Sequence, residues 1–299
     1  MNKKRLRSFL RIPVKNQLHR YTRSTFGKLF FMLFLFALGA FSVLPLIYCI
    51  TTSFKPLDEL MLFPPTLITV RRPTIANYTA LPDLISVLSI PISRYIFNSL
   101  FVSVAGTAIC VVISAMAAFV LSKTEIRFKG VIFTVIQFSL LFNGYTLAVP
   151  QYMVYSQIGI INTYWVYLIP AAASSMGVFL MKQYMDGYVP DALIEAAHID
   201  GADWIRIFMK IIFPIVRPCV LTLVMFSFLG IWNTVPSGTV FSESLKTLPT
   251  VMSTIAAGGL ARTGSSMATS VIMMILPIIV YLVSQSSIKE TMGSAGIKG

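Results

Sequence analysis

Long apolar segments separated by shorter polar ones make up most of this chain. Six of these segments come close to the ~20 residues that an α-helix needs to cross the hydrocarbon core of a bilayer. They cover residues 29–54, 96–121, 130–149, 164–181, 212–232 and 267–284. Residues 130–181 hold no charged side chain and are too long for one span, so they are divided into two. The pattern predicts an all-α integral membrane protein with six transmembrane helices.

The polar stretches between the spans suggest how the chain is organised. A proline-rich stretch separates the first span from the other five. We therefore expect a basic N-terminal segment (1–28), a first transmembrane helix (29–54), an extracellular segment (55–94), a transmembrane domain of five helices (95–285) and a C-terminal tail (286–299). A charged loop, residues 188–218, interrupts the five-helix domain.

The second span carries small residues at every fourth position, namely Gly106, Cys110, Ser114 and Ala118. Residues four apart lie on one face of a helix, and small side chains there let two helix backbones approach closely. This spacing predicts close packing of the second span against a neighbouring helix.

Composition and charge favour a membrane protein over a nucleic-acid-binding one. The sequence is 56% hydrophobic and 12% charged, whereas charged residues make up about a quarter of soluble domains. With the N-terminus inside, the inner segments carry 18 Lys and Arg residues and the outer segments carry 6. By the positive-inside rule, this difference predicts that both termini are cytoplasmic.

The first 28 residues hold nine Lys or Arg and no acidic residue. An RNA-binding arm is one reading, but a leader attracted to anionic lipid headgroups is favoured in so apolar a chain. No small-residue cleavage site follows the first apolar segment, so we expect this segment to stay as an anchor. Membrane lipid is therefore an expected partner and nucleic acid is not.

No catalytic or metal site is indicated. Cys49, Cys110 and Cys219 lie in or beside apolar runs, as buried hydrophobic residues do, and the two histidines are not spaced as ligands. The sequence contains no phosphate-binding G-x-x-x-x-G-K-[ST] stretch, so we expect no ATP hydrolysis and no bound cofactor in this chain.

The charged loop 188–218 predicts a helix–glycine–helix unit on the aqueous side of the membrane. Pro190 suits a first helical turn, and Gly201 can adopt the left-handed backbone that ends a helix. Asp203 is then placed to cap a second helix. An ordinary polar loop between two spans is the alternative that these signals leave open.

The order of residues in this loop resembles the EAA loop of permease subunits of binding-protein-dependent ABC importers. The family pattern is E-A-A, three residues, G, nine residues and I-x-L-P; here Phe213 replaces the leucine. The matching positions are Glu195, Ala196, Ala197, Asp200, Gly201, Ala202 and Pro214. The segment GIINTYWVYLIP, the Trp232-Asn233 pair and the glycine-rich tail are similar to the maltose-permease-like second subunit, and within it to oligosaccharide permeases of Gram-positive bacteria.

The resemblance covers most of residues 95–299 and implies a type I ABC importer fold in a bacterial plasma membrane. It also implies three kinds of partner: a second homologous permease, two copies of a cytoplasmic ATPase subunit that uses ATP and Mg²⁺, and an extracellular sugar-binding protein. Residues 195–201 would then form the coupling helix that docks on the ATPase, with Ala196 and Ala197 allowing a close approach.

Two other classes remain open from the residues alone. An ion-coupled secondary transporter of a neutral solute usually keeps ionisable side chains within its spans, and the predicted span interiors have none. A membrane-anchored structural subunit without a transport path is the weaker alternative.

Neutral polar and aromatic side chains near the spans suit a sugar better than an ion. The candidates for the substrate path are Asn143, Tyr145, Gln151, Trp232 and Asn233. Four further aromatic residues, Tyr155, Tyr164, Trp165 and Tyr167, are assigned mostly to the aromatic belt at the membrane interface. The identity of the sugar is not encoded in any pattern of the sequence.

Overall fold

A computed structural model describes residues 25–63, 66–86, 90–142, 144–236 and 238–296. This described part consists of helices joined by turns and contains no β-strand, which confirms the predicted all-α class. It falls into two units, the first ending at Tyr48 and the second beginning at Cys49.

The first unit contains most of helix α1 (Thr25–Ser53). Its apolar part, Phe26–Ser53, is long enough to cross a bilayer, and none of its most apolar window is buried within the chain. A helix that is apolar all round and covered by no protein suits lipid surroundings. The helix agrees with the predicted first span, whereas residues 1–24 of the basic segment lie outside the described residues.

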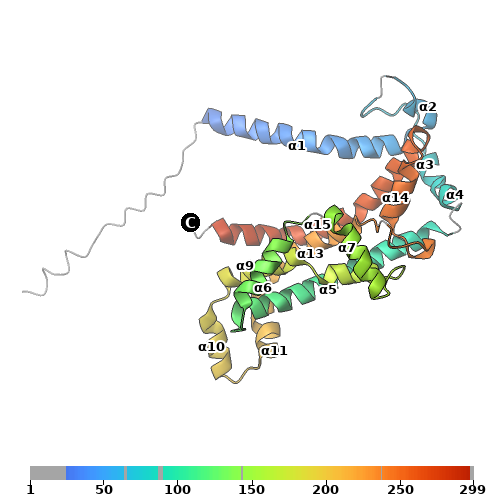
Figure 1. Cartoon of the computed structure of the whole chain (residues 1–299). Coiled ribbons are helices and arrows are strands. Elements are labelled where there is room, and N and C mark those ends of the chain that lie inside the picture. Colours follow the sequence, from blue (N-terminus) through green and yellow to red (C-terminus); the bar gives the residue numbers. More distant parts are fainter. Residues whose placement is uncertain (1–24, 64–65, 87–89, 143, 237, 297–299) are drawn as a thin grey trace, which may run out of the picture. The chain divides into compact units, whose positions relative to one another are not determined.

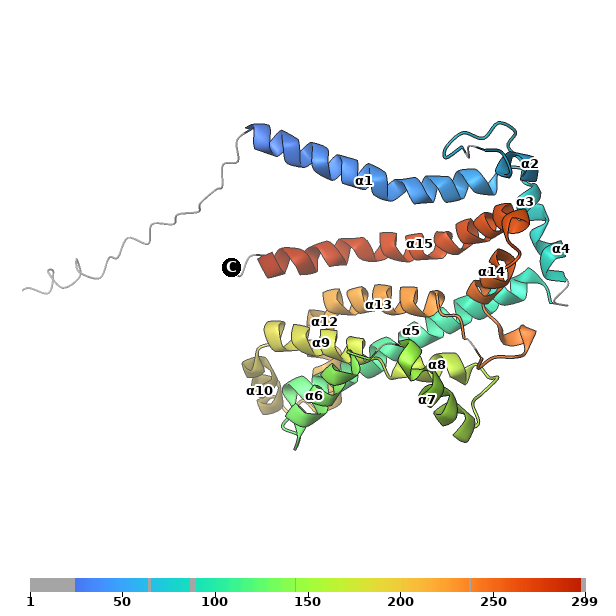
Figure 2. The ribbon, with the colours of Figure 1, turned by 45° about the horizontal axis from the view of Figure 1, so that its top comes forward.

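The second unit is built around one long helix, α5 (Ile92–Lys123). Three segments pack directly on α5: α8 (Trp165–Ala172), α9 (Ser175–Tyr188) and α13 (Arg217–Trp232). Helix α15 (Thr263–Gly296) packs on α13 in turn. Figures 1 and 2 show α5 passing among these helices. Helices α10 (Asp191–Ile199) and α11 (Trp204–Ile207) lie near one of its ends, and α14 (Leu248–Ala256) lies near the other.

The small residues of the second span lie where the helices come closest, as predicted. Gly106, Cys110, Ser114 and Ala118 are all buried. A Cβ atom added at Gly106 would lie 3.0 Å from Cδ1 of Ile231 on α13. Packing of α5 against neighbouring helices therefore depends on side chains of minimal size.

Fewer than six helices of the described part reach spanning length. Within the described ranges, four helices are long and apolar enough to cross a membrane, or five if one bent pair counts as a single span. The predicted third span, 130–149, is divided between α6 (Lys129–Ser139) and α7 (Gly144–Gln157) by a turn at 140–142. The count of six therefore stays a prediction.

The expected extracellular segment is ordered by polar contacts around its short helices α2 (Leu57–Leu60), α3 (Ala76–Thr79) and α4 (Leu81–Ser86). The buried carboxylate of Glu59 accepts hydrogen bonds from the backbone N–H of Arg71, at 3.0 Å, and of Arg72. The ammonium of Lys55 donates to Thr66. These bonds tie the proline-rich chain back to the end of α1.

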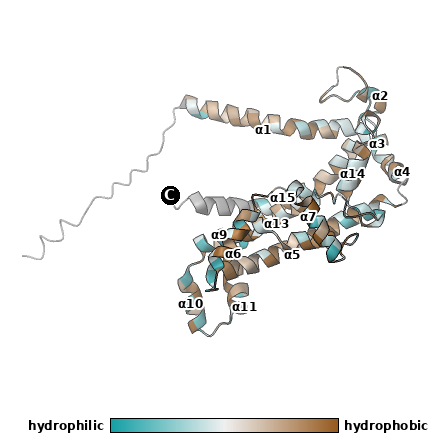
Figure 3. Ribbon diagram, in the orientation of Figure 1, coloured by the Kyte–Doolittle hydropathy of each residue, from teal (hydrophilic) through white to brown (hydrophobic). Residues whose placement is uncertain are grey.

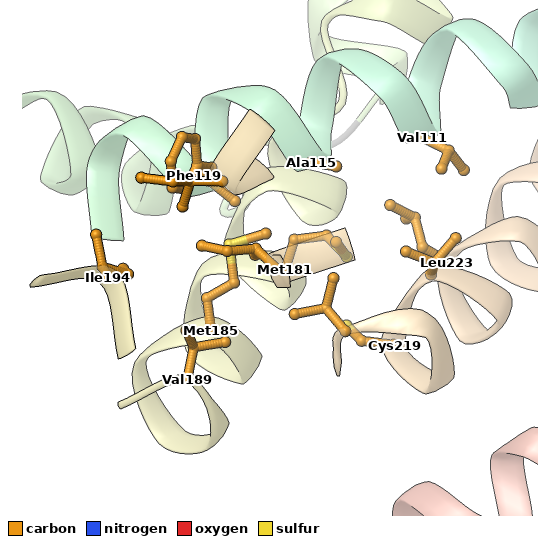
Figure 4. Close-up of a cluster of buried hydrophobic side chains, with 14 of the residues drawn as sticks. Val111, Ala115, Phe119, Met181, Met185, Val189, Ile194, Cys219 and Leu223 are labelled. Carbon is orange, nitrogen blue, oxygen red and sulfur yellow. The ribbon is translucent and has the colours of Figure 1, made fainter. Parts of the chain in front are cut away.

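The main apolar core lies at the end of α5 that faces α10. Side chains of α5, such as Phe119, face Met181 and Met185 of α9, Ile194 of α10 and Leu223 of α13 (Figure 4). This core joins the predicted charged loop to the membrane-spanning helices, so it decides how the loop is held.

Candidate functional site

The charged loop folds as the helix–glycine–helix unit that its sequence predicts. Helix α10 (Asp191–Ile199) follows Pro190, and its C-cap is Asp200. Gly201 has a φ of +78°, the left-handed conformation that ends a helix and that side chains other than glycine adopt at a cost. We call residues 191–216 the EAA knob.

The second limb of the EAA knob begins at a capped helix and ends at a sharp bend. The carboxylate of Asp203 accepts a hydrogen bond of 3.0 Å from the backbone N–H of Arg206, which caps α11 (Trp204–Ile207). A π-helix, η1 (Phe208–Ile212), and α12 (Phe213–Ile215) follow. The limb then meets α13 at an angle of 80°. π-helical turns of this kind are frequent at functional sites.

One face of the EAA knob is part of the protein's own core. Ile194, Ala197, Ile207, Ile212 and Val216 are all buried there. Ala197 was expected to allow a close approach of another subunit, but its side chain is covered by residues of this chain. Ala197 is therefore part of the apolar core that includes residues of α5, α9 and α13.

The other face of the EAA knob is open. Its exposed matching residues are Glu195, Ala196, Asp200, Gly201 and Pro214, and Ala202 is half-buried. Two large apolar side chains stand among them, Ile199 at 87% exposure and Ile205 at 73%. Figure 3 shows hydrophilic and hydrophobic residues alternating along α10. An exposed surface that mixes carboxylates, small residues and isolated large apolar side chains is suited to docking on another protein.

A cavity of about 850 Å³ lies among α7, α8 and α13, away from the EAA knob. Its walls are mainly apolar, with a few hydroxyl, phenol and amide groups. These polar lining residues are Gln151, Tyr152, Tyr155, Tyr167, Ser174, Ser227, Thr234 and Thr239. No charged side chain is part of the lining among the described residues. Such walls can bind an uncharged polar molecule by hydrogen bonds and ring contacts.

One of the five predicted path residues lines this cavity. Gln151 does so, and its amide donates a hydrogen bond to the phenol of Tyr155. Trp232 is buried elsewhere, where its indole Nε1 donates to the carbonyl of Met273 at 3.0 Å. Asn233 is exposed and donates to the carbonyl of Leu229 at 2.8 Å.

The remaining two path candidates, Asn143 and the side chain of Tyr145, lie outside the described residues. Conversely, Tyr155 and Tyr167, which were assigned mostly to the interface belt, are buried and line the cavity. The i, i+4 spacing of Gln151 and Tyr155 could have indicated a shared helix face. No comparable local signal marks Tyr167 or Ser174, which reach the cavity from α8 and from the turn after it.

No protein-family model matches the chain. Individual relatives do. Protein LplC of Bacillus subtilis (strain 168) is 30% identical over 226 residues, which are 73% of this chain and 72% of that protein. The inner membrane ABC transporter permease protein YcjP of Escherichia coli (strain K12) is 28% identical, over 86% of this chain and 92% of its own length.

A third relative is the polygalacturonan/rhamnogalacturonan transport system permease protein YtcP of Bacillus subtilis (strain 168), 28% identical over 70% of this chain and 71% of its own. Among solved structures, a bacterial ABC transporter involved in the import of the acidic polysaccharide alginate matches with a TM-score of 0.72. That match covers 88% of this chain and 98% of the other, at 22% identity, and so concerns the fold.

Proposed function

Because the chain belongs to the permease family of carbohydrate ABC importers, we propose that it forms half of a sugar translocation path driven by separate ATPase subunits. A second homologous permease would form the other half of the path. Two copies of a cytoplasmic ATPase would use ATP and Mg²⁺, and an extracellular sugar-binding protein would deliver the substrate. The chain itself is a multi-pass membrane protein, and in this proposal both its termini are cytoplasmic.

The uncharged cavity among α7, α8 and α13 is the observation that supports a sugar. Tyrosine rings such as those of Tyr155 and Tyr167 can lie against the apolar faces of a pyranose. The amide of Gln151 and the hydroxyl of Ser227 can exchange hydrogen bonds with sugar hydroxyls. Since no Lys or Arg of the described residues reaches this lining, the cavity favours a neutral carbohydrate over an acidic one.

The open face of the EAA knob supports the proposed coupling to an ATPase. Glu195 would pair with a basic group of the ATPase, and the left-handed backbone at Gly201 would fix the angle between the two limbs. The large exposed side chain of Ile199 would insert into an apolar pocket of that partner. Closure of the ATPases on ATP would push on α10 and switch the helices between two arrangements.

The first experiment is affinity purification of the tagged chain from detergent-solubilised membranes, with identification of co-purifying proteins. We expect a second permease and an ATPase, and the purified complex should import neutral oligosaccharides into liposomes only with ATP inside and binding protein outside. A chain that purifies alone and supports uptake driven by an ion gradient would contradict the proposal in favour of a secondary transporter.

A further inference from the structure

A lysine at the end of α5 holds the start of the EAA knob. The ammonium of Lys123 lies 2.6 Å from the carbonyl oxygen of Val189 and 2.8 Å from the carboxylate of Asp191. The Lys123 side chain is only 4% exposed, whereas that of Asp191 is 78% exposed. Burial of an ammonium is unfavourable unless hydrogen bonds and an opposite charge compensate for lost water, as these two partners do.

The preceding residue of α5 makes a second polar tie, to α9. The hydroxyl of Ser122 donates to the carboxylate of Asp186, which also pairs with Lys182 at 2.6 Å. Two consecutive α5 residues are therefore fastened to the end of α9 and to the first residues of α10.

Apolar side chains also pack α5, α9 and α10 together. Met181 and Met185 of α9 are fully buried, and they belong to one apolar cluster with Ala115 and Phe119 of α5 and Ile194 of α10 (Figure 4). Close-packed side chains of this kind transmit a displacement, because the interior has little free volume to absorb it.

The outgoing limb of the EAA knob, residues 204–216, also enters the apolar core, through Ile207, Ile212 and Val216, but it lacks the kind of polar tie that Lys123 makes to α10. Its contacts with α5 include the ring of Phe119 against those of Trp204, at 6.0 Å, and Phe208, at 5.4 Å. In the part of the chain that the structure describes, no ion pair joins residues 204–216 to α5. This limb also contains the π-helix and the 80° bend before α13. Sharp kinks of helices occur at π-helical turns, which are frequent at functional sites.

We propose that Lys123 is a positioning residue that fastens α10 to α5, so that force on the EAA knob enters the membrane through α5 and α9. The bend between α12 and α13 then acts as the hinge, because its angle changes when the EAA knob is displaced. This inference rests on the proposed function, because it requires an ATPase that pushes on α10. It assigns Lys123, which lies 68 residues before Asp191 and outside the EAA pattern, to the coupling machinery.

The test compares ATP hydrolysed per sugar imported in the complete complex reconstituted in liposomes. Lys123→Met removes the ammonium and keeps most of the apolar side chain. Lys123→Arg keeps the charge, and Asp191→Asn weakens only the exposed half of the tie. Lys129→Met is the matched control, since Lys129 is an exposed lysine at the start of α6 on the same side of the protein.

We expect Lys123→Met to raise the ATP used per sugar at least about fivefold, the lower end of typical coupling effects between sites. Asp191→Asn should act in the same direction more weakly, whereas Lys123→Arg and Lys129→Met should match the wild type. A wild-type ratio in both Lys123→Met and Asp191→Asn would overturn the proposal.

If Lys123→Met fails to assemble, the ratio measured for Asp191→Asn alone decides the test. The Asp191 side chain is exposed, so its replacement by an amide leaves the apolar core intact. Failure of the wild-type chain to purify with an ATPase would instead contradict the proposed function itself. The two failures are therefore distinguishable, the first by the ratio and the second by the composition of the complex.

Discussion

Replacing Gly177 with alanine tests the close approach of α9 to α5. Both the apolar core and the proposed transmission of force from α10 to α5 and α9 depend on this contact. An added Cβ would lie 3.0 Å from Cβ of Ser114, closer still to its hydroxyl, and 3.1 Å from the hydroxyl of Ser174. Rotation can move a hydroxyl, but Cβ of Ser114 can move only with α5. Overpacking of this kind costs about 1–3 kcal/mol.

The same substitution also stabilises the helix itself, because the intrinsic helix propensity of alanine is more favourable than that of glycine by about 1 kcal/mol. Gly187 supplies the control for that term, because it lies on the same helix, is exposed, and has nothing within 4 Å of an added Cβ. Gly187→Ala should therefore stabilise slightly. The difference between the two variants isolates the packing cost, ~1–3 kcal/mol in favour of Gly187→Ala.

Thermal unfolding of the purified protein in detergent measures this difference. For a chain of this size, 1 kcal/mol corresponds to roughly 2–4 °C in Tm. Ser114→Gly should restore the stability of Gly177→Ala in a double-mutant cycle, because it removes the two α5 atoms that the new methyl group meets. Equal Tm shifts for Gly177→Ala and Gly187→Ala would refute the close approach of α5 and α9.

Three further outcomes follow from the site. Gly201→Ala places a Cβ on a backbone with a φ of +78°, at a cost of about 1–2 kcal/mol, and should lower sugar uptake per ATP. Gly201→Asn should lower uptake less, and equal uptake in the two variants would show that the left-handed backbone at Gly201 is not needed for coupling. Tyr155→Phe removes a phenol from the cavity and should raise the KM for uptake without changing ATPase co-purification, and an unchanged KM would place the sugar elsewhere. Trp232→Phe leaves the carbonyl of Met273 without its buried donor and should lower stability by about 1–3 kcal/mol, measured by thermal unfolding, with the KM for sugar unaffected.

Local signals were sufficient for the EAA knob. Pro190, Gly201 and Asp203 each act on the backbone within a few residues, through a fixed φ, a permitted left-handed φ and a side-chain cap. The structure reproduces the glycine and the aspartate cap, whereas Pro190 is the N-cap residue of α10 and lies one position before its first turn. The small residues of α5 were also interpreted correctly, because their fourfold spacing defines a face wherever the neighbouring helix lies.

Hydropathy identified apolar segments but not where they break or which way they face. The segment 130–149 is apolar throughout, yet a turn at 140–142 divides it between α6 and α7. Within a membrane both sides of a helix are apolar, so composition does not distinguish a core face from a lipid face. This is why Tyr155 and Tyr167 were assigned to the interface belt although they line a cavity.

The sequence by itself determined the membrane class, the apolar segments and the helix–glycine–helix order of the EAA knob, because these depend on length, hydropathy and nearest neighbours along the chain. Only the tertiary structure decided that Ala197 faces inward, that Trp232 bonds to Met273, and that Lys123 reaches Asp191. Those contacts join residues distant in sequence, and they exist only after several helices have packed together.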